Sequence, residues 1–182
     1  MQDDPREIIH RLYHGHRKAE HILLSHSEAV SRKALEVARL VPHLEPDLKF
    51  IQEAALLHDI GMIRTSAPML GCHGDLPYIC HGVEGRQILE SHGLHAHALV
   101  CERHVGVGLT VKDIKANNFP IPEYEMLPIS VEEKIVCFAD KFFSKIGGTR
   151  EKTVQEVRSS ISRYGEDKIR EFDSMLSLFS PV

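Results

Sequence analysis

The sequence predicts an all-α protein, and three observations support that prediction. Apolar residues in the longer segments recur at intervals of three and four residues, which is the period of one helix face. Proline and glycine gather between these segments, where helices end. Sustained alternation of apolar and polar residues, the sign of a half-buried strand, is not found. We therefore expect a compact helical bundle without strands.

Two helices are expected in the N-terminal part of the chain. Asp4-Pro5 is typical of a helix start, a cap followed by proline at the first helical position, so a short helix should continue through about Tyr13. The second helix begins at Ser25 or Ser27 and ends at Val41, because its apolar residues keep helical spacing up to the prolines that follow.

A third helix ends on the most informative feature of the sequence. Asp47 caps its start, and the apolar run 54–57 leads directly into His58-Asp59, with Gly61 just beyond as a C-terminal glycine. An ionised carboxylate buried without a partner is strongly unfavourable. The aspartate of this pair is therefore expected to be paired, protonated or bound to a metal.

Four further helices are expected toward the C-terminus, at about 82–91, 95–105, 131–146 and 151–178. The last of these is interrupted near Gly165. Glycine and proline make 65–80 loop-like and 117–130 irregular, and we expect 65–80 and 106–130 to line or cover a substrate pocket. At 182 residues the whole chain, 1–182, is predicted to form one domain.

Composition excludes several classes of partner. With 22 basic and 26 acidic residues the formal net charge is −4, so no basic footprint for nucleic acid and no polybasic membrane patch is expected. The N-terminus has no apolar segment typical of a signal peptide, and no apolar stretch is long enough to span a membrane. The four cysteines form no CxxC motif and are interpreted as reduced thiols, which predicts a cytoplasmic protein.

Thirteen histidines are the strongest compositional anomaly. Six histidine and aspartate residues stand in apolar surroundings on or next to five predicted helices: His26, His58, Asp59, His81, His104 and Asp140. Taken singly, most of these residues are also consistent with a purely structural role, such as an ion pair of Asp140 with Lys141. Together they form a mixed imidazole and carboxylate set that suits one or two divalent transition metals. Iron or manganese is predicted, with zinc and nickel as further candidates.

The order of these six residues resembles the HD-domain superfamily of metal-dependent phosphohydrolases. It is closest to members in which the His-Asp pair continues as Ile60-Gly61 and which carry two additional histidines; the resemblance covers residues 26–140. It implies a helical HD-domain bundle with a metal-binding core at about 22–146 and C-terminal helices at about 151–178. It also implies that one metal is held by His26, His58, Asp59 and Asp140. Asp59 would bridge to a second metal that His81 and His104 complete.

The resemblance further implies an enzyme that hydrolyses a phosphate ester or anhydride by attack of a metal-activated hydroxide. The substrate would be a nucleotide or another small phosphorylated molecule. The catalytic residues proposed on this basis are Asp59, Arg64, Arg103 and Lys141, of which the last three are candidates to bind the substrate phosphate. For those three, a surface or ion-pair role is the alternative. The sequence does not predict the oligomeric state.

Three further interpretations concern residues around the site. Many relatives place a lysine at the position of Met62, so a phosphate-binding role is absent here or has moved to Arg64. Glu84, three residues after His81, is a candidate to support that histidine, or is an exposed helix residue. Four other histidines lie in polar stretches and are predicted to be on the surface: His73, His92, His95 and His97.

Two alternative functions share the same six ligands. Some HD-type proteins hold a mixed-valent di-iron pair and act as oxygenases, and the phosphonate-cleaving members place a tyrosine and a glutamate upstream of the first histidine. Here Tyr13 and Glu20 do not clearly reproduce that pattern. A non-catalytic metal-bound sensor is the other alternative, although such modules usually lose ligands and none of the six is lost.

Overall fold

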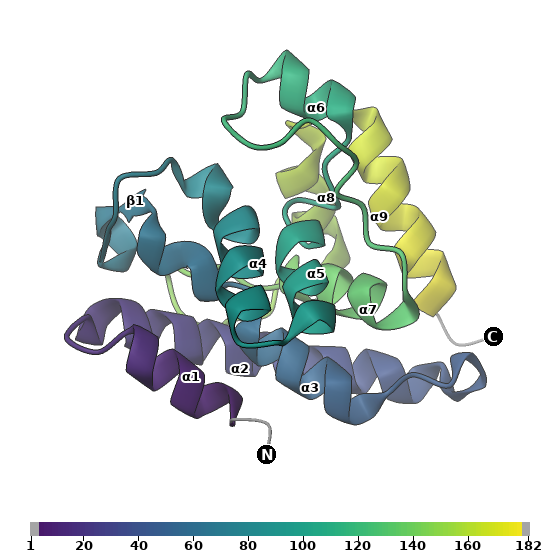
Figure 1. Cartoon of the computed structure of the whole chain (residues 1–182). Helices are drawn as coiled ribbons and strands as arrows, with labels where there is room; N and C mark the ends of the chain where they lie inside the picture. The colour runs from purple at the N-terminus through teal and green to yellow at the C-terminus, as the bar shows by residue number, and fades with distance from the viewer. Residues whose placement is uncertain (1–3, 180–182) are drawn as a thin grey trace.

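The structure, a computed structural model, describes residues 4–179. Residues 1–3, part of the N-terminus considered above, and 180–182 lie outside the described part. The α-helices, shown in Figure 1, are α1 (Pro5–Leu12), α2 (Arg17–Leu40), α3 (Leu48–Leu57), α4 (His81–Ser91), α5 (His95–Arg103), α6 (Val111–Ala116), α7 (Val131–Asp140), α8 (Val154–Ser162) and α9 (Glu166–Phe179). The predicted all-α class is confirmed.

Short 3-10 helices and one small hairpin connect the main helices. The 3-10 helices are η1 (Pro42–Leu44), η2 (Ile60–Arg64), η3 (Pro68–Leu70) and η4 (Tyr78–Cys80). Strands β1 (Ser66–Ala67) and β2 (Cys72–His73) pair antiparallel. The expectation of a fold without strands is therefore wrong for these four residues, where a glycine turn at Gly71 brings two extended dipeptides side by side.

The long helix α2 connects two hydrophobic cores. In Figure 1, α1, α2 and α3 lie along one side of the molecule, and α4 and α5 stand against them. The first part of α2, with Leu23, packs in a core shared with α1, α4 and α5. Its second part, with Val30, packs in a core shared with α3, α7 and α9. His26 lies between these two apolar stretches, so the junction of the cores is where polar ligands can meet.

Local sequence signals set several helix ends. Asp47 and Ser130 accept hydrogen bonds from backbone N–H groups in the first turns of α3 and α7, and Thr153 forms a capping box at α8. Gly165 separates α8 from α9, as predicted. These caps fix where α3 and α7 begin, and so where their far ends deliver side chains.

Three predicted boundaries are wrong. Helix α2 begins at Arg17, well before Ser25, because polar residues hid the apolar spacing of its first turns. Helix α7 ends at Asp140 instead of continuing to position 146, and Gly147 and Gly148 follow with positive φ. The segment 106–130 is not wholly irregular, since a capping box at Thr110 starts the short helix α6.

Gly61 has a different role from the C-terminal glycine that the sequence suggested. It lies within η2, and its φ is not positive. A Cβ at this position would lie 2.2 Å from the backbone N of Gly85 and 2.2 Å from the carbonyl oxygen of His81, both in α4. The missing side chain allows η2 and α4 to touch through their backbones, which brings His81 toward Asp59.

Replacing Gly61 by alanine is therefore expected to destabilise the fold by about 3 kcal/mol or more, because backbone atoms cannot move aside as a flexible side chain can. Chemical denaturation measured by circular dichroism checks this. Gly93→Ala is the control, since nothing lies within 4 Å of a Cβ there and only the strain of its positive φ is expected. Equal stability of Gly61→Ala and the unsubstituted protein would contradict the close approach.

Within the part of the chain that the structure describes, none of the helices is both long and apolar enough to cross a membrane.

Candidate metal centre

Six side chains from five helices converge on one buried point. His26 lies in the middle of α2, His58 and Asp59 follow the end of α3, and the others come from the start of α4, the end of α5 and the end of α7: His81, His104 and Asp140. All six are buried. The predicted set is thus brought together, mostly at helix ends, where the polypeptide changes direction and side chains project past the helix.

The first group consists of His26, His58, Asp59 and Asp140, which each offer one ligand atom within 4.8 Å of the others. The Nε2 atom of His26 lies 2.9 Å from Oδ1 of Asp140 and 3.3 Å from Oδ2 of Asp59. The Nε2 atom of His58 lies 3.1 Å from the same Oδ2. Two imidazoles and two carboxylates therefore surround a single small volume.

The second group uses the other oxygen of Asp59. Nε2 of His81 lies 3.3 Å from Oδ1 of Asp59, and Nε2 of His104 lies 3.4 Å from it. Because Oδ2 faces the first group and Oδ1 faces the second, the carboxylate of Asp59 lies between both. This arrangement is suited to a carboxylate that bridges two cations.

Backbone carbonyls fix three of the histidine rings. The Nδ1 atoms of His58, His81 and His104 each lie 2.7 Å from the carbonyl oxygen three residues earlier. A carbonyl oxygen only accepts, so each Nδ1 carries the proton and donates it. With a metal bound, each Nε2 would present its lone pair to the centre of the site, which is the usual arrangement of a metal-binding histidine.

The arrangement of the donor atoms is unfavourable without a bound cation and is suited to divalent cations. Nε2 of His81 and Nε2 of His104 are 3.3 Å apart, so two lone pairs face each other when both Nδ1 atoms are protonated. Nε2 of His58 and Oδ1 of Asp59 are buried without a hydrogen-bond partner. Groups of this kind are costly unless a cation satisfies them. The set of histidine nitrogens and carboxylate oxygens is typical of transition-metal sites.

Burial and neighbouring charges shift the pKa values of two histidines, one in each group of ligands, in opposite directions. Burial lowers the pKa of His81 to about 3, more than Asp59 raises it, so this imidazole is neutral at pH 7. Burial also disfavours the charged form of His58, but Asp59 and Asp140 outweigh it and raise the pKa of His58 to about 9. Burial opposes ionisation of Asp59 too, yet Lys145 and His58 hold its pKa well below the ordinary value.

Two lysines contact the carboxylates of the centre. Nζ of Lys141 lies 2.7 Å from Oδ2 of Asp140 and donates a hydrogen bond to the carbonyl oxygen of His104. Nζ of Lys145 lies 2.7 Å from Oδ2 of Asp59 and 5.9 Å from the centre of the Tyr78 ring. Lys141 was a predicted site residue; Lys145 was missed, because the prediction treated 131–146 as one continuous helix and gave its side chain no direction.

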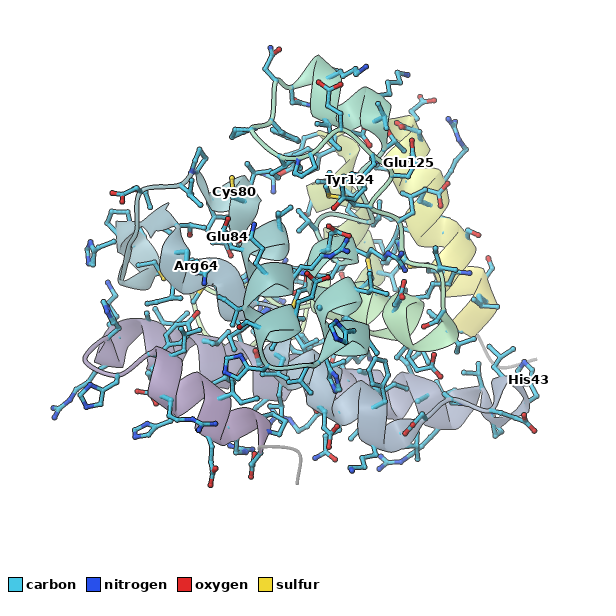
Figure 2. The ribbon with its side chains drawn as sticks, viewed as in Figure 1. His43, Arg64, Cys80, Glu84, Tyr124 and Glu125 are labelled. Carbon is cyan, nitrogen blue, oxygen red and sulfur yellow. The ribbon has the colours of Figure 1, made fainter. Side chains whose placement is uncertain are left out.

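The structure does not bring the two predicted arginines to the centre. Arg64 donates to Glu84 at 2.9 Å, and Figure 2 shows the two labelled side chains close together. Glu84, considered as support for His81, is therefore held by this arginine. Arg103 donates to both carboxylate oxygens of Glu133, at 2.9 and 3.0 Å. Phosphate binding by either arginine would require it to leave its present partner.

Three of the four histidines predicted to be on the surface, His73, His92 and His95, are exposed. The fourth prediction is wrong. His97 is buried, with its Nε2 atom 3.4 Å from a carboxylate oxygen of Glu53 and its ring against Phe50. The local sequence did not reveal this, because His97 follows two exposed residues, His95 and Ala96, at the start of α5.

Neither residue considered for iron gating lies in the ligand cluster. The hydroxyl of Tyr13 donates to the carbonyl oxygen of Ile60, and Glu20 pairs with His10 at 2.8 Å. Both side chains are thus committed to other partners.

A cavity of about 840 Å³ adjoins the centre. Its walls include the ligand Asp140, the lysines Lys141 and Lys145, and the ring of Tyr78, whose buried hydroxyl has no hydrogen-bond partner. The predicted loops 65–80 and 106–130 contribute part of the lining, and the rest comes mainly from the segment 140–152 and from α8 and α9. The cavity is large enough for a small organic molecule and reaches the ligand Asp140.

Comparisons with known proteins identify the fold family of the site. Residues 23–144 match the HD domain. An uncharacterized protein of Methanocaldococcus jannaschii is 37% identical over 74% of this chain and 72% of its own length. No solved structure matches the chain.

Two other relatives are longer proteins named tRNA (cytidine(56)-2'-O)-methyltransferase. The one from Picrophilus torridus is 30% identical over 69% of this chain and 33% of its own length. The one from Thermoplasma volcanium is 26% identical over 88% of this chain and 42% of its own length. The chain therefore corresponds to less than half of either methyltransferase.

Proposed function

The chain belongs to the HD domain family, and on that premise we propose that it is a metal-dependent phosphohydrolase acting on a small phosphorylated molecule such as a nucleotide. The observation that carries the proposal is the position of Asp59, with one carboxylate oxygen facing His26 and His58 and the other facing His81 and His104. Such an arrangement suits two cations, and a pair of cations is typical of phosphate hydrolysis.

The residues of the chain have distinct roles in this proposal. His26, His58, Asp59 and Asp140 would hold one metal, and Asp59, His81 and His104 would hold the second. When bound, divalent metals of this kind lower the pKa of a water molecule and polarise a phosphoryl oxygen. Iron or manganese is proposed, with zinc or nickel as alternatives, because the ligands are imidazoles and carboxylates without thiolate.

Lysines complete the site on the cavity side. Lys141 and Lys145 contact the carboxylates of Asp140 and Asp59, and both line the cavity through which a substrate enters. Their ammonium groups are placed to donate hydrogen bonds to phosphate oxygens. We propose that they take the phosphate-binding role that the sequence had also assigned to Arg64 and Arg103, because the two lysines line the cavity and the two arginines do not.

Methyl transfer is not proposed for this chain. The two relatives with that name extend well beyond the matched part, which is 33% and 42% of their length. The buried groups found here suit metal binding, and the proposed hydrolysis needs no methyl donor.

The proposal is tested with protein purified without chelators and reloaded with Mn²⁺ or Fe²⁺. We expect release of phosphate or nucleotide from at least one member of a panel of aryl phosphates, nucleotides and phosphodiesters, at a rate at least about a hundredfold above the chelated protein. Oxygen uptake measured in the same samples separates hydrolysis from oxygenation. Absence of hydrolysis across the panel with every metal, or turnover that consumes oxygen, would contradict a phosphohydrolase.

A further inference from the structure

The cavity beside the metal centre has a strongly basic lining in an acidic protein. Five basic residues line it, against the carboxylates of Asp113 and Asp140: Lys141, Lys145, Lys152, Arg163 and Lys168. The formal net charge of the chain is −4. A concentration of positive charge in a concave surface attracts anions.

Three of these five cations already have carboxylate partners. Lys141 pairs with Asp140, Lys145 with Asp59, and Lys168 with Asp113. Their charges are therefore balanced within the protein. An anion bound in the cavity away from the metal centre would have its charge compensated by the other two cations.

Lys152 and Arg163 have no carboxylate partner among residues 4–179. Nζ of Lys152 donates only to the carbonyl oxygens of Lys141 and Phe143, both at 3.4 Å. The guanidinium of Arg163 lies 5.1 Å from the centre of the Tyr164 ring. Burial lowers the pKa of Lys152, and the positive charges of Lys141 and Arg163 add to that shift against the opposing effect of Asp140. The two cations therefore stand in an environment that lacks an anion.

The same cavity has an apolar rim. Met69, Ile146 and Tyr164 line it, and they expose 71%, 59% and 65% of their surface. Large apolar side chains this exposed around a pocket mark contact with an apolar or planar part of a ligand. A ligand that reaches from the metals to Lys152 and Arg163 would lie against this rim.

We propose that Lys152 and Arg163 form a second anion subsite, so that the preferred substrate carries a second phosphate besides the one that is hydrolysed. The inference rests on the proposed phosphohydrolase function, which assigns the first phosphate to the metal centre. An organic part the size of a nucleoside joins the two phosphates and contacts the rim. A bisphosphorylated nucleoside has this chemistry.

The second subsite lies outside the part of the chain that matches the family. The HD domain match ends at residue 144, whereas Lys152 precedes α8 and Arg163 follows it. In Figure 1, α8 and α9 pack together beside the rest of the bundle. The metal chemistry and the substrate choice are thus supplied by different segments, and the C-terminal helices select the substrate.

The test compares adenosine 3',5'-bisphosphate with adenosine 5'-monophosphate on the Mn²⁺-loaded protein. Binding is measured by calorimetry and turnover by phosphate release. Lys152→Met and Arg163→Gln remove each charge while keeping much of the side-chain volume. Arg170→Ala is the matched control, because that arginine is 72% exposed on α9 and does not line the cavity.

We expect the unsubstituted protein and the Arg170→Ala variant to bind the bisphosphate at least about tenfold more tightly than the monophosphate. The ratio of the affinity for the bisphosphate to that for the monophosphate should fall toward one in Lys152→Met and in Arg163→Gln. Equal binding of the two nucleotides, or an unchanged ratio in both variants, would overturn the second subsite. The expected preference in binding without turnover would support the subsite and contradict the phosphohydrolase.

Discussion

The substitution Asp59→Asn is expected to reduce metal-dependent turnover by about a thousandfold, because it removes a charge and one of the two oxygens that face the two groups of ligands. An amide offers one oxygen, so either the side of His26 and His58 or the side of His81 and His104 meets an NH₂ donor instead. Initial rates and metal content of the purified variant check this expectation.

The control for that substitution is Asp75→Asn. Asp75 is exposed and lies outside the ligand cluster. The rate and metal content of the Asp75→Asn variant should therefore match those of the unsubstituted protein. Because Lys145 loses its carboxylate partner in Asp59→Asn, thermal unfolding of the variant must be measured as well. A folded Asp59→Asn variant that keeps its metals and its rate would contradict the bridging role.

Metal binding is expected to stabilise the folded protein strongly. The donor atoms come from α2, α3, α4, α5 and α7, so an assembled site exists only in the folded chain. At a free metal concentration about a thousand times Kd, one site adds about 4 kcal/mol to the free energy of unfolding. For a protein of this size that corresponds to a rise in Tm of about 8–16 °C.

Scanning calorimetry of chelated and Mn²⁺-loaded protein measures this rise. The His81→Ala variant should show a smaller increase in Tm on metal binding than the unsubstituted protein, because only its second group of ligands is incomplete. His43→Ala serves as the control, since His43 is exposed at the far end of the molecule from α4 in Figure 2 and should not change the effect of the metal. An identical Tm with and without metal would show that the cluster does not bind the ion.

The metal ligands could be predicted from sequence because their chemistry contradicts their surroundings. His58 and Asp59 end an apolar helix, and the structure shows both fully buried. Asp140 likewise ends the apolar helix α7. A charge at a position where its neighbours are buried is visible without knowledge of the fold.

The residues around the ligands could not be predicted in the same way. Lys145 reaches Asp59 only because α7 ends at Asp140 and the chain turns back, and the apolar spacing suggested that the helix continued. Arg64 and Arg103 looked equally available for phosphate, yet each has a glutamate partner that is distant in sequence. Ion pairs of this kind depend on tertiary structure, which no local pattern records.

Gly61 shows a similar limit on a smaller scale. A glycine just after a helix suggests a C-terminal cap, and that interpretation needs only local sequence. Glycine is required at this position because the backbone of α4, which is distant in sequence, lies too close to leave room for a Cβ.

The number of metal ions bound per chain tests the central claim most directly. Protein reconstituted with Mn²⁺, freed of loosely bound ion and analysed by mass spectrometry of the metal is expected to contain two ions per chain. His81→Ala and His104→Ala should each retain one, because the first group of ligands is intact in both. A single ion in the unsubstituted protein, or two in either variant, would contradict a dinuclear site bridged by Asp59.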